Sequence, residues 1–207
     1  MAYQRLKLST TTPSVVRHFI EGTIENHYFS DIHAMLRLPL PEQEIVAGQN
    51  FAITQVLMAV ISGISITLYD KKGRPGDLFK AVIKDYFPWN EEPANDVPPK
   101  AAAGIIYEVF RNPLTHAGGL FVDMREDQRY LVQKSYSVRV NRIMTPDKLD
   151  GHSEEWIEAL ETALERPHID QTLKVRNEMK VINIEGLYWC VRRMIQKLTD
   201  DKKKMIT

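Results

Sequence analysis

The sequence of 207 residues contains a single cysteine, Cys190, so it cannot form an internal disulfide bond. Its opening residues also lack the pattern of a secretory signal, namely a basic segment, an apolar run and a small-residue cleavage site. On both grounds we expect a protein of the reducing cytoplasm. Cys190 lies beside the apolar face of a predicted helix, where we expect a buried, inert thiol because no neighbour in sequence favours the thiolate.

An excess of charge of either sign is also missing. Lysine and arginine number 27, aspartate and glutamate number 27, and the formal net charge is therefore zero. This balance excludes a polybasic protein that holds nucleic acid by bulk charge, so any contact with nucleic acid must be local. Hydrophobic residues make up 43% of the chain and charged residues 26%, which are the proportions of a folded globular protein.

The common catalytic and metal-binding motifs are absent from the sequence. It has no glycine-rich phosphate loop, no Gly-x-Ser-x-Gly elbow and no paired cysteines for zinc. Three histidines of the first predicted helix are spaced too irregularly to share one face: His18, His27 and His33. Glu165 and His168 have the spacing of a diiron motif, but Pro167 between them would break the helix that must present both. We therefore expect no metal site and no cofactor.

The predicted fold class is mainly α, a helical bundle with a small β elaboration in the C-terminal third. Apolar residues recur near the 3.6-residue period in four segments: 14–36, 42–69, 78–86 and 100–111. The segment 42–69 has the strongest pattern and is predicted to be the central helix of the bundle. Its stretch 51–68 is almost long enough to cross a membrane, but polar residues dilute it. A buried or dimer-facing helix is expected there, and no membrane contact.

After residue 128 the composition changes, because β-branched and aromatic residues begin to alternate with polar ones. Four further elements are predicted: strands over 130–143 and 172–181, and helices over 153–167 and 185–198. We expect one compact unit, in which residues 1–127 form the helical core and residues 128–207 form a strand–helix–strand–helix elaboration. The last helix is expected to pack back on the bundle.

Positive charge is concentrated near the end of the chain. Residues 171–207 hold nine basic and four acidic groups, whereas residues 148–170 hold two basic and seven acidic groups. The candidate nucleic-acid-binding residues here are Lys174, Arg176, Arg192 and Arg193, with Lys180 and Lys197 nearby. Such a patch could meet phosphate groups, and a solvated polar face is the competing explanation.

One stretch, residues 107–116, combines residue types suited to catalysis on RNA. Arg111 ends an apolar helix, Asn112 follows it directly, and His116 comes five positions after the arginine. An arginine, a polar neighbour and a histidine at this spacing resemble the motif of the HEPN family of α-helical domains, many of which are metal-independent ribonucleases. The resemblance covers these ten residues. It implies an HEPN-like helical bundle, to which the strand-bearing part would be an elaboration.

The resemblance also implies roles for the three residues. Cleaving RNA without metal needs a group that takes the proton of the ribose 2′-hydroxyl and a cation that stabilises the charge of the transition state. His116 suits the first role because histidine exchanges protons near neutral pH, and Arg111 suits the second because its planar guanidinium stays charged. Asn112 would orient either of them. Pro113 departs from the family pattern and is expected to bend or interrupt the helix.

The leading hypothesis is a metal-independent endoribonuclease of toxin or defence type. HEPN nucleases pair so that two motifs face one another across a cleft, which implies a homodimer with Arg111 and His116 of both copies in one composite site. An antitoxin or another protein partner is then also expected. The alternative is a non-catalytic HEPN-like module that binds a nucleotide, RNA or a protein partner. A third hypothesis is a structural dimer joined through residues 51–68, with no contact to nucleic acid.

Overall fold

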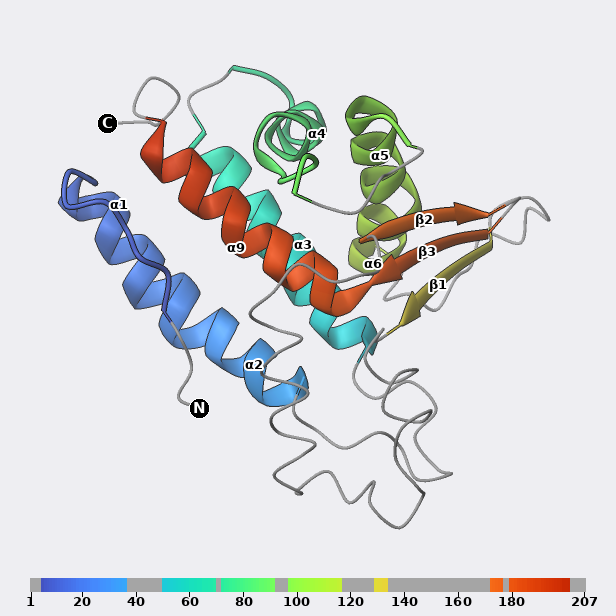
Figure 1. The fold of residues 1–207 in the computed structure, drawn as a ribbon, viewed down its shortest axis with the longest axis horizontal. Helices are drawn as coiled ribbons and strands as arrows, with labels where there is room; N and C mark the ends of the chain where they lie inside the picture. The colour runs from blue at the N-terminus through green and yellow to red at the C-terminus, as the bar shows by residue number, and fades with distance from the viewer. Residues whose placement is uncertain are drawn as a thin grey trace, which may run out of the picture.

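The fold is described from a computed structural model. The description covers these residues: 5–36, 50–69, 72–91, 97–116, 129–133, 172–176 and 179–201. Within them the backbone alone is described for Thr115, His116, Arg176, Met179 and the segment 129–133. The described part is mainly helical with one small sheet (Figure 1), which confirms the predicted fold class in its coarse form.

The first helix runs over residues 14–36, as predicted, and has three parts. These are α1 (Ser14–His18), the wider η1 (Phe19–Phe29) and α2 (Ser30–Leu36). In η1 the backbone bonds to the fifth residue instead of the fourth, so its turns are wider than those of an α-helix. One side of the helix is buried through apolar residues that include Ile20, Ile24, Phe29, Ile32 and Leu36.

The second predicted helix is α3 (Asn50–Thr67), and the segment 42–49 of that prediction lies outside the described residues. By length and composition, α3 is the helix of the described chain that could cross a membrane. One side packs into the core, whereas Phe51 and Ile66 on the other side are 40% and 54% exposed. Such a half-buried apolar helix is also what the core of a globular protein contains.

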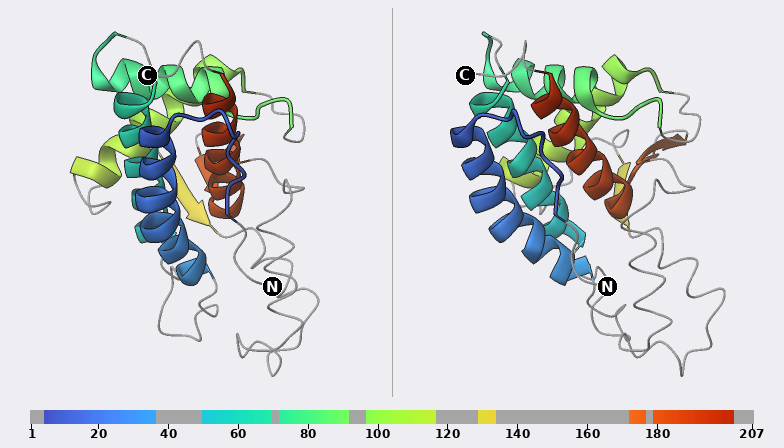
Figure 2. Two further views of the ribbon diagram at one scale, coloured as in Figure 1. Left: turned by 90° about the vertical axis from the view of Figure 1, so that its left-hand side faces the viewer. Right: turned by 60° about the vertical axis from the view of Figure 1, so that its left-hand side comes forward.

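The last helix, α9 (Ile184–Asp200), lies in the core of the bundle beside the predicted central helix, α3. Every residue from 184 to 191 is buried, on all sides of the helix. α9 packs against α3 and against α4 (Pro75–Tyr86), and the ring of Tyr188 meets Phe29 of η1 edge-on at 5.4 Å. Figure 2 shows α9, α3 and the first helix side by side. α3 itself contacts the first helix, α4 and α9, which agrees with its predicted place in the bundle.

One continuous helix runs over residues 99–116, formed by α5 (Pro99–Ile105), η2 (Ile106–Arg111) and α6 (Asn112–His116). The prediction that Asn112 and Pro113 break this helix was wrong, since Asn112 has helical angles of φ −64° and ψ −51°. Its N–H donates to the carbonyl of Tyr107, five residues back. Proline normally clashes with the carbonyl four residues before it. The wider turn of η2 shifts the hydrogen-bond register before Pro113 and so accommodates the ring.

The sheet has three strands in the order β1-β3-β2. β1 (Arg129–Gln133) runs parallel to β3 (Met179–Asn183), and β2 (Leu173–Arg176) runs antiparallel to β3. The single strand predicted over 172–181 is therefore two strands, because the alternation of apolar and polar residues continues through both. Of the strand predicted over 130–143 the structure describes the start, and the helix predicted over 153–167 lies outside the described residues.

Two tyrosines link α4 to its neighbours. Tyr69 donates a hydrogen bond to Asp85 at 2.7 Å, and Tyr86 donates one to Asp201, after the end of α9, also at 2.7 Å. The two rings meet edge-on with centroids 5.7 Å apart. Burial raises the pKa of both hydroxyls, and the neighbouring carboxylates raise it further because a phenolate would repel them. Both phenols therefore remain hydrogen-bond donors well above neutral pH.

Candidate nucleic-acid site

Arg111 ends η2, and its guanidinium is held on two sides. Its Nη1 donates a hydrogen bond to Oδ1 of Asn112 at 3.1 Å. The guanidinium carbon also lies 5.5 Å from the centre of the Tyr107 ring, a cation–π contact between residues four apart on one helix. The side chains of Arg111 and Asn112 are both partly exposed. The predicted pair is thus in contact, although Nε of the arginine is buried.

Tyr107 is a site residue that the sequence interpretation missed. Its ring packs against Phe79 with centroids 5.4 Å apart, and Nζ of Lys80 lies 5.3 Å from the ring centre. Gly76, at the start of α4, approaches so closely that a Cβ there would overlap the tyrosine hydroxyl. Tyr107 therefore joins the Arg111 turn to α4 and brings a lysine and an arginine to one ring. The spacing of Tyr107 and Arg111 was the available signal.

His116 is the last residue of α6, and its side chain lies outside the described part of the structure. The backbone places its position on the same helix as Arg111. Five α-helical steps rotate one position about 140° from the other around the helix axis. The two positions therefore lie on different sides of the helix.

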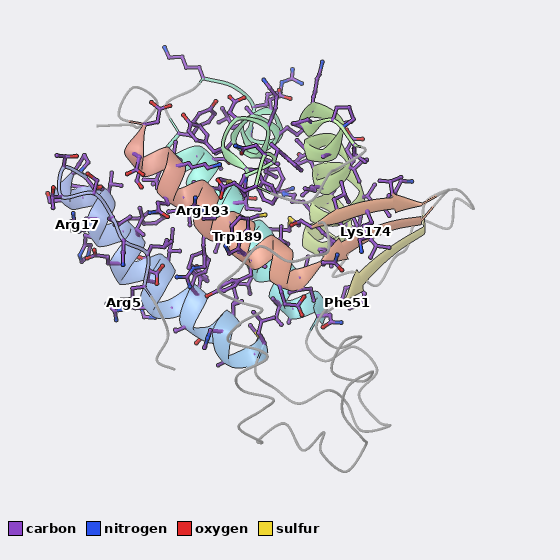
Figure 3. The ribbon with its side chains drawn as sticks, viewed as in Figure 1. Arg5, Arg17, Phe51, Lys174, Trp189 and Arg193 are labelled. Atoms are coloured by element: carbon purple, nitrogen blue, oxygen red, sulfur yellow. The ribbon has the colours of Figure 1, made fainter. Side chains whose placement is uncertain are left out.

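The predicted basic patch is divided between two parts of the fold. Lys174 lies on β2 and Arg193 lies midway along α9, well apart in Figure 3. The side chain of Arg176 is outside the described part. Arg192 donates to the Tyr188 hydroxyl at 2.8 Å and lies over the rings of Tyr188 and Phe29. This arginine helps to attach the first helix to α9.

Arg193 belongs to a charge network with Glu91 and Lys197. One carboxylate oxygen of Glu91 accepts from Arg193 at 3.0 Å, and the other lies 2.6 Å from Nζ of Lys197. Burial alone would raise the pKa of Glu91, but the hydrogen bonds and charges of Lys197 and Arg193 lower it overall. The side chain of Arg193 also lies over Trp189 (Figure 3). One carboxylate thus bridges both basic groups, which fits a structural role, and the network keeps one net positive charge.

Comparisons of the chain with protein-family models, with curated proteins and with solved structures found no match.

The structure describes the surroundings of Cys190 and of several histidines. Among the described residues, no three His, Cys, Asp or Glu side chains are grouped so that they could hold a metal ion. His27 is exposed, whereas His33 is 7% exposed and lies on the core side of α2. Cys190 is fully buried, 3.3 Å from the Thr172 hydroxyl. A thiol in this position is shielded from solvent.

Proposed function

We propose that the protein is a cytoplasmic, metal-independent endoribonuclease of toxin or defence type. The observation that carries the proposal is the geometry of Arg111, a half-buried residue that Asn112 and Tyr107 hold at the end of a wide helical turn. A guanidinium held in this way suits the binding of a phosphodiester, because its planar fork matches two phosphate oxygens. Turns of this wider type also occur often at functional sites.

The proposed reaction is attack of the ribose 2′-hydroxyl on the adjacent phosphorus. His116 takes the proton of the 2′-hydroxyl as the new oxygen–phosphorus bond forms. Arg111 stabilises the negative charge on the phosphoryl oxygens in the transition state. The bond to the 5′-oxygen then breaks, and a protonated imidazole returns a proton to that oxygen. The products would be a 2′,3′-cyclic phosphate and a 5′-hydroxyl end.

A second copy of the chain fits this proposal. The backbone positions of Arg111 and His116 lie about 140° apart around one helix, so a single copy does not direct them to one point. If two copies face each other across a cleft, Arg111 of one can approach His116 of the other, and two histidines are then present to take and to return a proton. Arginines in the cleft would also favour neutral imidazole, the form that acts as a base.

The test compares RNA cleavage by wild type and by His116→Ala, in EDTA, after both have been shown to fold and to share one oligomeric state. His27→Ala is a matched control, since His27 is an exposed histidine on a different helix. We expect discrete fragments from wild type and from His27→Ala, and loss of cleavage in His116→Ala. Equal cleavage by all three proteins would overturn the role of His116.

The second candidate function is a binding module without catalysis. A cavity lined by three lysines and two carboxylates lies between α4 and the helix over residues 99–116, adjoining the Tyr107 contacts, and its small net positive charge favours an anionic group in a ligand. The two candidates predict different behaviour of one variant. Under the first, His116→Ala loses cleavage. Under the second, wild type binds RNA or a nucleotide without cleaving it, and His116→Ala leaves that binding largely intact.

A further inference from the structure

The cavity between α4 and the helix over residues 99–116 is a site that the proposed nuclease chemistry does not use. It has a volume of 360 Å³, within the range of sites for small molecules. Four residues of α4 line one wall: Asp77, Lys80, Ala81 and Lys84. Their spacing of three, four and seven residues places them on one face of the helix. The second wall has the same type of spacing.

Small residues create the cavity. Its floor is formed by Ala81, Ala103 and Gly104, which leave room between the two helices. A Cβ built on Gly104 would meet nothing within 4 Å outside its own helix. No close contact therefore requires a glycine at position 104, and the space above Gly104 is open to a ligand.

Charged residues surround this floor in an uneven arrangement. Tyr107 contacts Gly76 and Lys80 near the start of α4, so Asp77 and Glu108 belong to the end of the cavity near Tyr107. Lys84 lies seven residues from Asp77 and Lys100 eight residues from Glu108, about 10 to 12 Å along their helices. The end near Tyr107 thus has two carboxylates and Lys80, and the end farther from Tyr107 has two ammonium groups.

No ion pair between described residues crosses the cavity. Lys80 pairs with Asp77 at 3.5 Å along α4, and Lys84 pairs with Asp85 at 3.2 Å, next to it in sequence. Two helices that merely pack together would gain more from opposite charges at facing positions. Both of these pairs lie along α4, so among the described residues no ion pair joins Lys100 or Glu108 of the second wall to the first wall.

We propose that this cavity binds a small zwitterionic organic phosphate, a molecule with a phosphate ester at one end and an amine at the other. Lys84 and Lys100 hold the phosphate, and the carboxylate of Glu108, beside the Asp77–Lys80 pair, accepts hydrogen bonds from the amine. The body of the molecule lies over Ala81, Ala103 and Gly104. The inference does not rest on the proposed nuclease function, because neither Arg111 nor His116 lines the cavity.

The test is calorimetric titration of the full chain with three probes. Glucosamine 6-phosphate carries both groups, glucose 6-phosphate lacks the amine, and glucosamine lacks the phosphate. Each missing group removes a charge-assisted contact, so we expect glucosamine 6-phosphate to bind about tenfold more tightly than either control. Binding of all three with equal affinity, or no heat from glucosamine 6-phosphate at millimolar concentration, would overturn the inference.

Variants assign the binding to this cavity. Lys100→Gln should weaken glucosamine 6-phosphate about tenfold, whereas Lys72→Gln, an exposed lysine in the turn before α4, should leave its affinity unchanged. Glu108→Gln should reduce the preference for glucosamine 6-phosphate over glucose 6-phosphate.

Gly104→Leu fills the floor and should prevent binding, with Gly104→Ala as the milder variant if the first fails to fold. Thermal unfolding of each variant checks the fold. Equal weakening by Lys100→Gln and Lys72→Gln, or unchanged binding by folded Gly104→Leu, would show that the probes bind elsewhere.

Discussion

Gly186 allows the start of α9 to lie directly against Thr172, the residue before β2. A Cβ on Gly186 would stand 2.8 Å from the Thr172 hydroxyl oxygen and 3.3 Å from Thr172 Cα. Thr172 is fully buried and its hydroxyl also contacts the Cys190 thiol at 3.3 Å, so it has little room to move. Gly186→Ala should therefore force apart two elements of the core. Gly63 in α3 is the matched control, because a Cβ there meets nothing within 4 Å outside its own helix.

Two opposing effects determine how much Gly186→Ala changes the free energy of unfolding. Replacing a helical glycine with alanine stabilises by about 0.5 to 1 kcal/mol through backbone entropy and helix propensity. Overpacking a close-packed core costs about 1 to 3 kcal/mol. At Gly186 the cost of overpacking is the larger effect, so we expect its alanine variant to lose about 1 to 2 kcal/mol of unfolding free energy. Gly63→Ala should gain about 0.5 to 1 kcal/mol, since only the helix effect applies.

Urea denaturation of the three proteins, with the m-value compared between them, measures these differences. Thr172→Ala provides a further check, because it removes the closest contact of the added methyl group. The double variant with Gly186→Ala and Thr172→Ala should lose less unfolding free energy than the two single variants lose together. If Gly186→Ala proved at least as stable as wild type, the described packing of α9 against Thr172 would be wrong.

Two further predictions concern charge. Glu91→Gln should lower the free energy of unfolding by about 1 kcal/mol at pH 7, as expected for a three-charge network. The difference in stability between the variant and wild type should shrink on acidification. The sign follows from the lowered pKa of Glu91, whose contribution is present above its ordinary value near 4.5 and lost below it; denaturation midpoints that show an undiminished difference at pH 3 would contradict it. Tyr69 and Tyr86 have raised pKa values in the fold, so the unfolded chain loses their protons first and stability should fall as the pH rises above 10. Replacing both by phenylalanine should flatten this alkaline decline, and an unchanged slope would argue against the two hydrogen bonds.

The helices were predictable because their residues repeat a local pattern. The helix predicted over 78–86 begins three residues earlier, at Pro75, and the one predicted over 100–111 begins at Pro99; proline suits the first turn because its missing N–H costs nothing there. The apolar faces of residues 14–36, 78–86 and 185–198 were also clear from the sequence. In each case the information lies within the segment itself, so a single sequence is enough to recover it.

Features that depend on contacts between distant segments were not predictable. The burial of α9 on all sides depends on which elements surround it, and alternation over 172–181 did not reveal the change of direction between β2 and β3. The turn at Pro113 depends on a change of hydrogen-bond register in η2. The contact of Tyr107 with Gly76 joins residues 31 positions apart in sequence, and no local pattern predicts it.

The central claim is that the chain cleaves RNA through the ribose 2′-hydroxyl without a metal ion. The most direct measurement incubates the wild-type protein in EDTA with an RNA oligonucleotide and with the same oligonucleotide carrying 2′-O-methyl groups throughout. We predict cleavage of the unmodified RNA alone, with 2′,3′-cyclic phosphate and 5′-hydroxyl ends identified by mass spectrometry. Equal cleavage of both oligonucleotides, or no cleavage of either by the folded protein, would contradict the account.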